Sequence, residues 1–155
     1  MRKKQAERRP VMPDPKYDDV IVSEFINCVM KRGKKHLARR IVYDALELVE
    51  QRTKNAGIEV FRKAMSNTRP VLEVRARRVG GATYQVPTEV RQDRSVALAI
   101  RWLITYASDR KDKSMSEKLA AEFIAASNGE GSAIKKKEDV HKMAEANKAF
   151  AHFKW

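Results

Sequence analysis

The sequence predicts a mainly α-helical protein, in which about six helices form a helical body and one basic β-hairpin protrudes from it. Two observations lead to this prediction. Apolar residues recur at the spacing of helix faces over most of the chain, whereas one stretch, at about residues 72–90, alternates apolar and charged residues. The length of 155 residues suffices for one core, because domains of ~150 residues bury roughly two-thirds of their unfolded surface.

Three regions are expected along the chain. Residues 1–16 form a basic extended arm, because three prolines in this stretch oppose a helix. Residues 17–131 form the helical body, which includes the hairpin. Residues 132–155 form a C-terminal helix and tail, whose few apolar residues predict that it lies against the surface or on a partner.

Three helices are predicted before the hairpin. Asp18 or Asp19 is suited to cap the first helix, which should end near Gly33. The second should start after Lys35, end at Gly57 and be followed directly by the third. The apolar stripe expected on the second helix consists of Leu37, Ile41, Ala45, Leu48 and Val49.

The hairpin is predicted from two extended runs around Gly80-Gly81. A turn is the simple interpretation of this glycine pair, since the chain has no phosphate-binding motif of the form G-x-x-x-x-G-K-[ST]. In the first strand Leu72, Val74 and Ala76 alternate with charged residues, which predicts one apolar and one charged face.

Helices are expected to resume after the hairpin. The first, from Ser95 to Ala107, has a broad apolar surface and should be the most buried helix, with Trp102 in the core. Ser114 and Glu117 have the spacing of a capping box at the start of the next helix. The last helix should extend over residues 132–150.

The charge balance points to a polyanionic partner. The chain has 33 Lys+Arg against 20 Asp+Glu, a formal net charge of +13, and such an excess repels itself unless a polyanion neutralises it. No apolar run reaches the about 18 residues of a membrane span, and no secretory signal is predicted. The single cysteine, Cys28, favours a reducing compartment, so the cytoplasm is the expected location.

Basic residues cluster in the hairpin, in loops and at both ends of the chain. Arginine suits phosphate binding because its planar fork donates two parallel hydrogen bonds. The alternative interpretation of the hairpin arginines is a charged, solvated edge that prevents aggregation. The residues predicted to bind RNA are Arg2, Lys3, Lys4, Arg8, Arg9, Lys31, Lys34, Lys35, Arg75, Arg77, Arg78, Tyr84, Arg91, Arg94, Arg110, Lys111, Lys113, Lys135, Lys136 and Lys137.

Catalytic and metal sites are not predicted. The histidines His36, His141 and His152 have no Cys or His partner at ligand spacing. Acidic residues fall mostly where they cap or balance helices. The chain is therefore expected to be no enzyme and to need no cofactor or metal.

The chain resembles the bacterial members of the small-subunit ribosomal protein seven family, and the resemblance extends nearly from end to end. The stretches that carry it are DPKY (14–17), KRGKK (31–35), LEVRARRVGGATYQVPTEVR (72–91), LAIRWL (98–103) and HKMAEANKAFAHFKW (141–155). The resemblance implies a protein of the small ribosomal subunit that binds the 3′ major domain of the ribosomal RNA and organises assembly of the head. It also implies that the hairpin lies near the exit-site tRNA and the mRNA path.

The resemblance assigns roles to some of the basic residues. Arg75, Arg77, Arg78 and Tyr84 belong to the protruding ribbon of the family. Further candidates for contact with ribosomal RNA are Lys31, Lys34, Lys35, Arg91 and Arg94. The C-terminal segment is expected to reach RNA and a neighbouring small-subunit ribosomal protein.

Other classes of protein fit the sequence less well. A DNA-binding regulator of helix-turn-helix type is the main alternative, with residues 34–50 as its best recognition helix, but it would not need the hairpin arginines. A nuclease would need a carboxylate cluster for metal ions. A membrane-surface protein would need a helix with a strong basic face and a wide aromatic one. The sequence has neither pattern.

Overall fold

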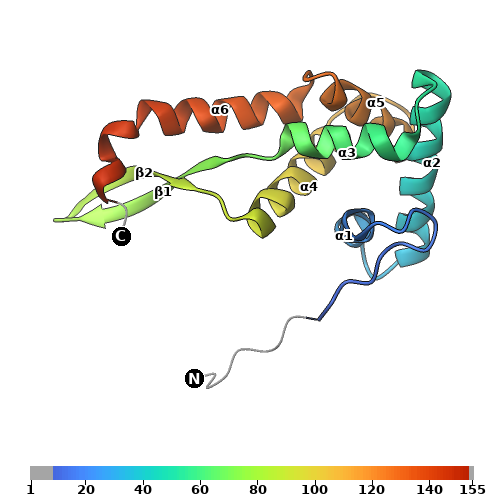
Figure 1. The fold of residues 1–155 in the computed structure, drawn as a ribbon, viewed down its shortest axis with the longest axis horizontal. Helices are drawn as coiled ribbons and strands as arrows, with labels where there is room; N and C mark the ends of the chain where they lie inside the picture. The colour runs from blue at the N-terminus through green and yellow to red at the C-terminus, as the bar shows by residue number, and fades with distance from the viewer. Residues whose placement is uncertain (1–8, 154–155) are drawn as a thin grey trace.

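The computed structural model describes residues 9–153, in which six α-helices, one two-stranded antiparallel sheet and a 3-10 helix follow one another (Figure 1). A helical body carries a hairpin that protrudes from one end, which confirms the predicted fold class (Figure 1). The elements are α1 (Val20–Val29), α2 (Lys35–Thr53), α3 (Gly57–Thr68), β1 (Leu72–Val79), β2 (Ala82–Glu89), α4 (Gln92–Ser108), α5 (Met115–Ser127), α6 (Ser132–Ala146) and η1 (Lys148–Phe153).

Three phenylalanine rings form the centre of the core. Phe25 of α1, Phe61 of α3 and Phe123 of α5 are fully buried, and their centroids lie 5.2–5.4 Å apart in edge-to-face arrangements. Helix α5 packs against α2, α3 and α4, so it, rather than α4, is the central helix. Trp102, which was predicted to lie in the core, packs against the core but is only partly buried. Its neighbour Leu103 is the fully buried residue.

The arm that leads to α1 is tied to the helical body at Asp14. The Asp14 carboxylate is buried and accepts hydrogen bonds from the backbone N–H of Lys16 and from the Tyr43 hydroxyl of α2, the latter at 2.7 Å. Burial and this hydrogen bond raise the pKa of Tyr43 to about 12. The predicted extended arm therefore ends in a fixed turn, which the prolines alone did not reveal.

Helix α1 is capped by Asp19, as predicted, whose carboxylate accepts a hydrogen bond from the Ile21 N–H at 2.8 Å. The helix ends at Val29, four residues before Gly33. Arg32 and Gly33 both take positive φ, 52° and 74°, and this turn leads directly into α2.

Gly57 has a different role from the predicted one. It begins α3, whereas α2 already ends at Thr53 with Lys54 in the left-handed conformation. A side chain at Gly57 would collide with the carbonyl oxygen of Leu46, so glycine here permits the close approach of two helices. On α2 the buried side is also displaced from the predicted stripe, because Ala38, Val42 and Leu46 are buried while Leu37 is half exposed.

Helix α4 begins at Gln92, three residues before the predicted start. Ser95 therefore lies inside the helix, where its hydroxyl donates a hydrogen bond to the Pro70 carbonyl at 2.8 Å. This bond connects α4 to the segment that enters β1, and β2 leads directly into α4. Both strands are therefore joined to α4 at the base of the hairpin.

The predicted last helix is divided in two. Helix α6 ends at Ala146, and η1 follows after Asn147 and packs on β2 (Figure 1). At the start of α6, the fully buried Glu122 carboxylate accepts hydrogen bonds from the Ala133 N–H and from the Arg110 guanidinium, at 3.1 and 2.7 Å. Helix α6 then runs beside the hairpin, so the C-terminal region lies against the protein's own surface, which is the first of the two placements that the sequence left open (Figure 1).

Candidate nucleic-acid interface

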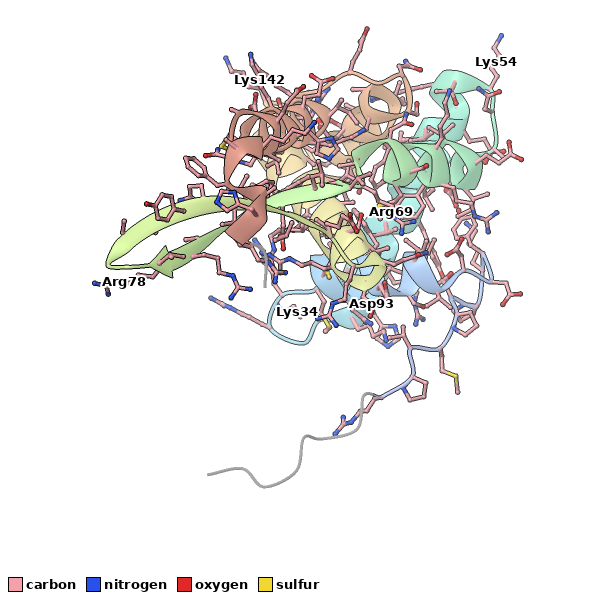
Figure 2. The ribbon with its side chains drawn as sticks, turned by 60° about the vertical axis from the view of Figure 1, so that its left-hand side comes forward. Lys34, Lys54, Arg69, Arg78, Asp93 and Lys142 are labelled. Carbon is pink, nitrogen blue, oxygen red and sulfur yellow. The ribbon has the colours of Figure 1, made fainter. Side chains whose placement is uncertain are left out.

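The hairpin carries its arginines away from the helical body. Its two-residue turn consists of Gly80 and Gly81, with φ of 58° and 88°, a conformation that glycine adopts without strain. Figure 2 shows Arg78 close to the tip of the hairpin. Arg77 and Arg78 are both exposed, so two guanidinium groups stand near the tip of the hairpin.

The strand register places cations on both faces of the hairpin. Arg77 lies opposite Tyr84, and Arg78 lies opposite Thr83. Since successive side chains of a strand point to opposite faces, Arg75 and Arg77 share one face and Arg78 lies on the other. The hairpin therefore carries arginine on both of its faces.

Glu73 organises the base of the hairpin, and its burial departs from the predicted alternation. This carboxylate, expected on the charged face, is the buried position of β1. It accepts hydrogen bonds from Arg75 of the same strand at 2.6 Å and from Arg94 of α4 at 2.7 Å. Burial alone would raise the pKa of Glu73, but these hydrogen bonds outweigh it and lower the pKa. Arg75 and Arg94 remain about half exposed.

Tyr84 has an aromatic partner within the protein. Its ring packs against Phe150 of η1 with a centroid distance of 5.3 Å. The contact holds η1 on β2 and leaves Tyr84 partly buried. That Tyr84 stacks on a nucleobase stays a prediction.

The loop between α1 and α2 forms a second basic group. Lys31, Lys34 and Lys35 are all exposed, and Figure 2 shows Lys34 on a loop well away from Arg78. Arg32, which was not among the predicted binding residues, is exposed in the same loop. The run KRGKK was the signal that could have included it.

The loop between α4 and α5 contains two exposed lysines and one arginine that is held by the helical body. Lys111 and Lys113 are exposed. Arg110 is instead held by the buried carboxylate of Glu122 at 2.7 Å and lies 3.6 Å from Asp112. Its guanidinium therefore has a structural function, which the sequence did not indicate.

The remaining predicted residues are dispersed. Arg91 is exposed at the N-terminus of α4, and Arg9 is exposed in the arm. On α6, Lys135 is exposed, whereas Lys136 and Lys137 are partly buried, and the Lys137 ammonium donates to the Asn67 carbonyl of α3 at 2.8 Å. The other predicted residues lie outside the described part of the chain: Arg2, Lys3, Lys4 and Arg8.

His141 connects α6 to the hairpin through a titratable hydrogen bond. Its Nε2 accepts a hydrogen bond from the Val71 N–H at 3.0 Å, which requires the neutral ring. Burial, and then the positive charge of Lys137, lower the pKa of His141. The His141 ring is therefore protonated less readily in the folded protein than in the unfolded chain.

The stability of the protein is expected to depend on His141 below neutral pH. Because the pKa of His141 is lower in the folded protein than in the unfolded chain, the neutral ring stabilises the fold. This stabilisation is fully present above the unfolded-state pKa of about 6.5, and it is lost as the pH falls through the folded-state pKa. Urea unfolding of the wild type and of His141→Gln between pH 7.5 and 5 checks this. The difference in unfolding free energy between the two should decrease on acidification, and a constant difference would contradict the assignment.

Neither a group of metal ligands nor a membrane-spanning helix occurs within residues 9–153. Within this range no three or more His, Cys, Asp or Glu side chains gather in a group that could hold a metal ion. Nor does any helix there combine the length and apolar character needed to span a membrane.

Comparison with known proteins gives full-length matches. The chain matches the family model described as ribosomal protein S7p/S5e over residues 1–148. It is 60% identical over 154 residues to the small ribosomal subunit protein uS7 of Gemmatimonas aurantiaca, covering 99% of each chain. The proteins of the same name from Cytophaga hutchinsonii and Myxococcus xanthus are 56% and 54% identical, covering 100% and 99% of each chain. The similarity thus includes the hairpin, the loops and the helical body.

Proposed function

The chain belongs to the ribosomal protein S7p/S5e family, and from that premise we propose that it binds the 3′ major domain of the small-subunit ribosomal RNA and organises assembly of the head. It is a structural protein of the small ribosomal subunit in the cytoplasm, and not an enzyme. Its partners are this RNA and neighbouring small-subunit proteins.

The observation that carries the proposal is the placement of exposed cations on projections from a rigid body. Arg77 and Arg78 lie near the tip of the hairpin, and further lysines lie in the loops before α2 and α5. Folded RNA hides the base edges of its deep groove, so proteins bind its phosphates, its 2′-hydroxyls and its shape. A rigid core with separate basic projections can reach several RNA helices at once.

The hairpin is proposed to lie near the exit-site tRNA and the mRNA path. Its length carries Arg78 away from the helical body (Figure 2). The strand register places arginine on both of its faces. Glu73 holds Arg75 and Arg94 at the base, so the cations near the tip are supported by a fixed base. The C-terminal segment, which packs beside the hairpin, is proposed to contact RNA and a neighbouring protein.

The helix-turn-helix alternative is less well supported. Its best recognition helix, α2, packs against α1, α3 and α5. Tyr43 of this helix is further covered by the arm through its hydrogen bond to Asp14. A recognition helix needs a free polar face to enter the major groove, and α2 is occupied on several sides.

Hydroxyl-radical footprinting on full-length small-subunit ribosomal RNA tests the proposed binding site. With magnesium present, we expect protection by the protein to be confined to the 3′ major domain. The same RNA without magnesium, which has lost its tertiary fold, is the control and should show little protection because shape is what the protein recognises. Protection scattered over all domains, or confined to another domain, would contradict the proposal.

A further inference from the structure

A pocket of about 430 Å³ lies where the α1–α2 loop meets the end of α4 and the start of α5. Much of its wall is apolar and includes the side chains of Leu37, Ile41, Ile104 and Met115. Ligand pockets typically have volumes of roughly 300–1,000 Å³ and mainly apolar walls. This volume lies within the range of pockets that hold one small organic group.

The apolar wall is open to solvent. Leu37, predicted as part of the buried stripe of α2, is 51% exposed, and Cys28 beside it is also exposed. Apart from its lysines and arginine, the lining carries no charge. The Ser108 hydroxyl donates a hydrogen bond to the Ile104 carbonyl, and partial burial raises the pKa of the Cys28 thiol. Accessible apolar walls inside a pocket are typical of ligand-binding sites.

The rim of the same pocket is cationic. Lys31, Arg32 and Lys34 line its mouth, and within residues 9–153 the structure records no carboxylate partner for them. The loop is held in shape by the positive φ of Arg32 and Gly33 and by the hydrogen bond from the Lys34 N–H to the Lys31 carbonyl at 3.1 Å. Three positive charges thus surround an uncharged, apolar floor.

We propose that this pocket receives one unstacked nucleobase of the bound ribosomal RNA, whose flanking phosphates lie on Lys31, Arg32 and Lys34. The inference rests on the proposed function and adds a contact to it. A nucleotide carries an uncharged base with apolar faces next to anionic phosphates, and proteins commonly bind such bases where single-stranded RNA leaves them unstacked. A protein segment would need an apolar anchor flanked by acidic residues, and the strongly basic surroundings favour RNA instead.

Cys28 allows a direct test because it is the only cysteine of the chain. The rate of its alkylation by iodoacetamide, a neutral reagent, is measured on the full chain, free and saturated with a 3′ major domain RNA fragment. We expect the bound RNA to slow alkylation by roughly fivefold or more, as when a base fills the pocket. A fully paired RNA duplex at saturating concentration is the control, and it should slow alkylation less than about twofold because its bases stay stacked.

A matched pair of variants separates this inference from the proposed function. Leu37→Ala, in the pocket wall, should weaken binding to the fragment by roughly fivefold, because the variant removes apolar surface that the bound base would cover. Val20→Ala removes a similarly exposed aliphatic side chain, 44% exposed and outside the pocket, and should not change the affinity. Unchanged binding by Leu37→Ala, or tight binding without protection of Cys28, would overturn the pocket but leave the RNA-binding function standing. Protection of Cys28 only in assembled subunits would also overturn it and point to a protein occupant. Absence of any binding to the fragment would overturn both proposals.

Discussion

Replacing Arg77 and Arg78 together by alanine is expected to weaken binding to a 3′ major domain RNA fragment by roughly thirtyfold, since each exposed guanidinium–phosphate contact contributes about 1 kcal/mol. Both side chains are exposed near the tip of the hairpin, so the fold should remain intact. Filter binding at fixed salt measures the affinity, and circular dichroism measures the fold. The slope of log affinity against log salt should fall by roughly 0.7–0.9 for each phosphate that the variant no longer neutralises.

The matched control for this variant removes the same charge elsewhere. Arg52→Ala combined with Lys63→Ala takes two exposed cations from α2 and α3, outside the predicted interface. It should reduce the affinity far less than the hairpin variant. Equal reductions in affinity for the two double variants would mean that only total charge matters, and the hairpin would not have its assigned role. Unfolding of the hairpin variant would show that its arginines are structural.

Replacing Phe123 by alanine is expected to lower the free energy of unfolding by about 3–5 kcal/mol, the range for truncation of a buried phenylalanine. Phe123 is fully buried and touches both Phe25 and Phe61, so its removal leaves a cavity where α1, α3 and α5 meet. Urea unfolding followed by circular dichroism measures the change.

Phe150→Ala is the comparison for this effect. Phe150 packs on Tyr84 but is only partly buried, so its truncation should cost about 1 kcal/mol, the size of an aromatic pair. A similar decrease in stability for both variants, or a decrease below about 1 kcal/mol for Phe123→Ala, would show that the phenylalanine cluster is not the centre of the core.

Turns and helix caps, which depend on residues close together in the chain, could be predicted from the sequence. The Gly80-Gly81 turn occurs as expected, because only a few residue types adopt positive φ at both positions of such a turn. The cap at Asp19 and the capping interaction from Ser114 to Glu117 also occur where the spacing placed them. These signals act within a few residues, so a single sequence is enough to reveal them.

Features that depend on distant partners could not be predicted. From the sequence alone, Gly57 is interpreted as the end of a helix. Its actual role depends on the distant Leu46 carbonyl, which leaves no room for a side chain at this position. Trp102 and Leu103 are adjacent and both apolar, and the burial of Leu103 depends on how the other helices pack against α4. Leu37 fits an apolar stripe in the sequence, yet in the fold it forms the wall of an open pocket.

The candidate interface likewise has a part that could be predicted from the sequence and a part that could not. The basic clusters were visible in the sequence, but which cations are available was not. Arg94 is held by Glu73 and Arg110 by Glu122, carboxylates that lie 21 and 12 positions away. Lys137 is engaged by a carbonyl of α3, 70 positions away. Arg78, Lys34 and Lys113 remain exposed, and they are the positions at which RNA contact is most directly testable.

The most direct test of the central claim is the affinity of the protein for the 3′ major domain RNA fragment, compared with unrelated RNA and duplex DNA of equal length. The three are measured across a salt series with magnesium present. We expect a large preference for the fragment that persists at moderate salt, because recognition of a folded shape adds to the charge attraction. Equal affinity for all three, falling together as salt increases, would contradict the account and reduce the interface to nonspecific attraction between opposite charges.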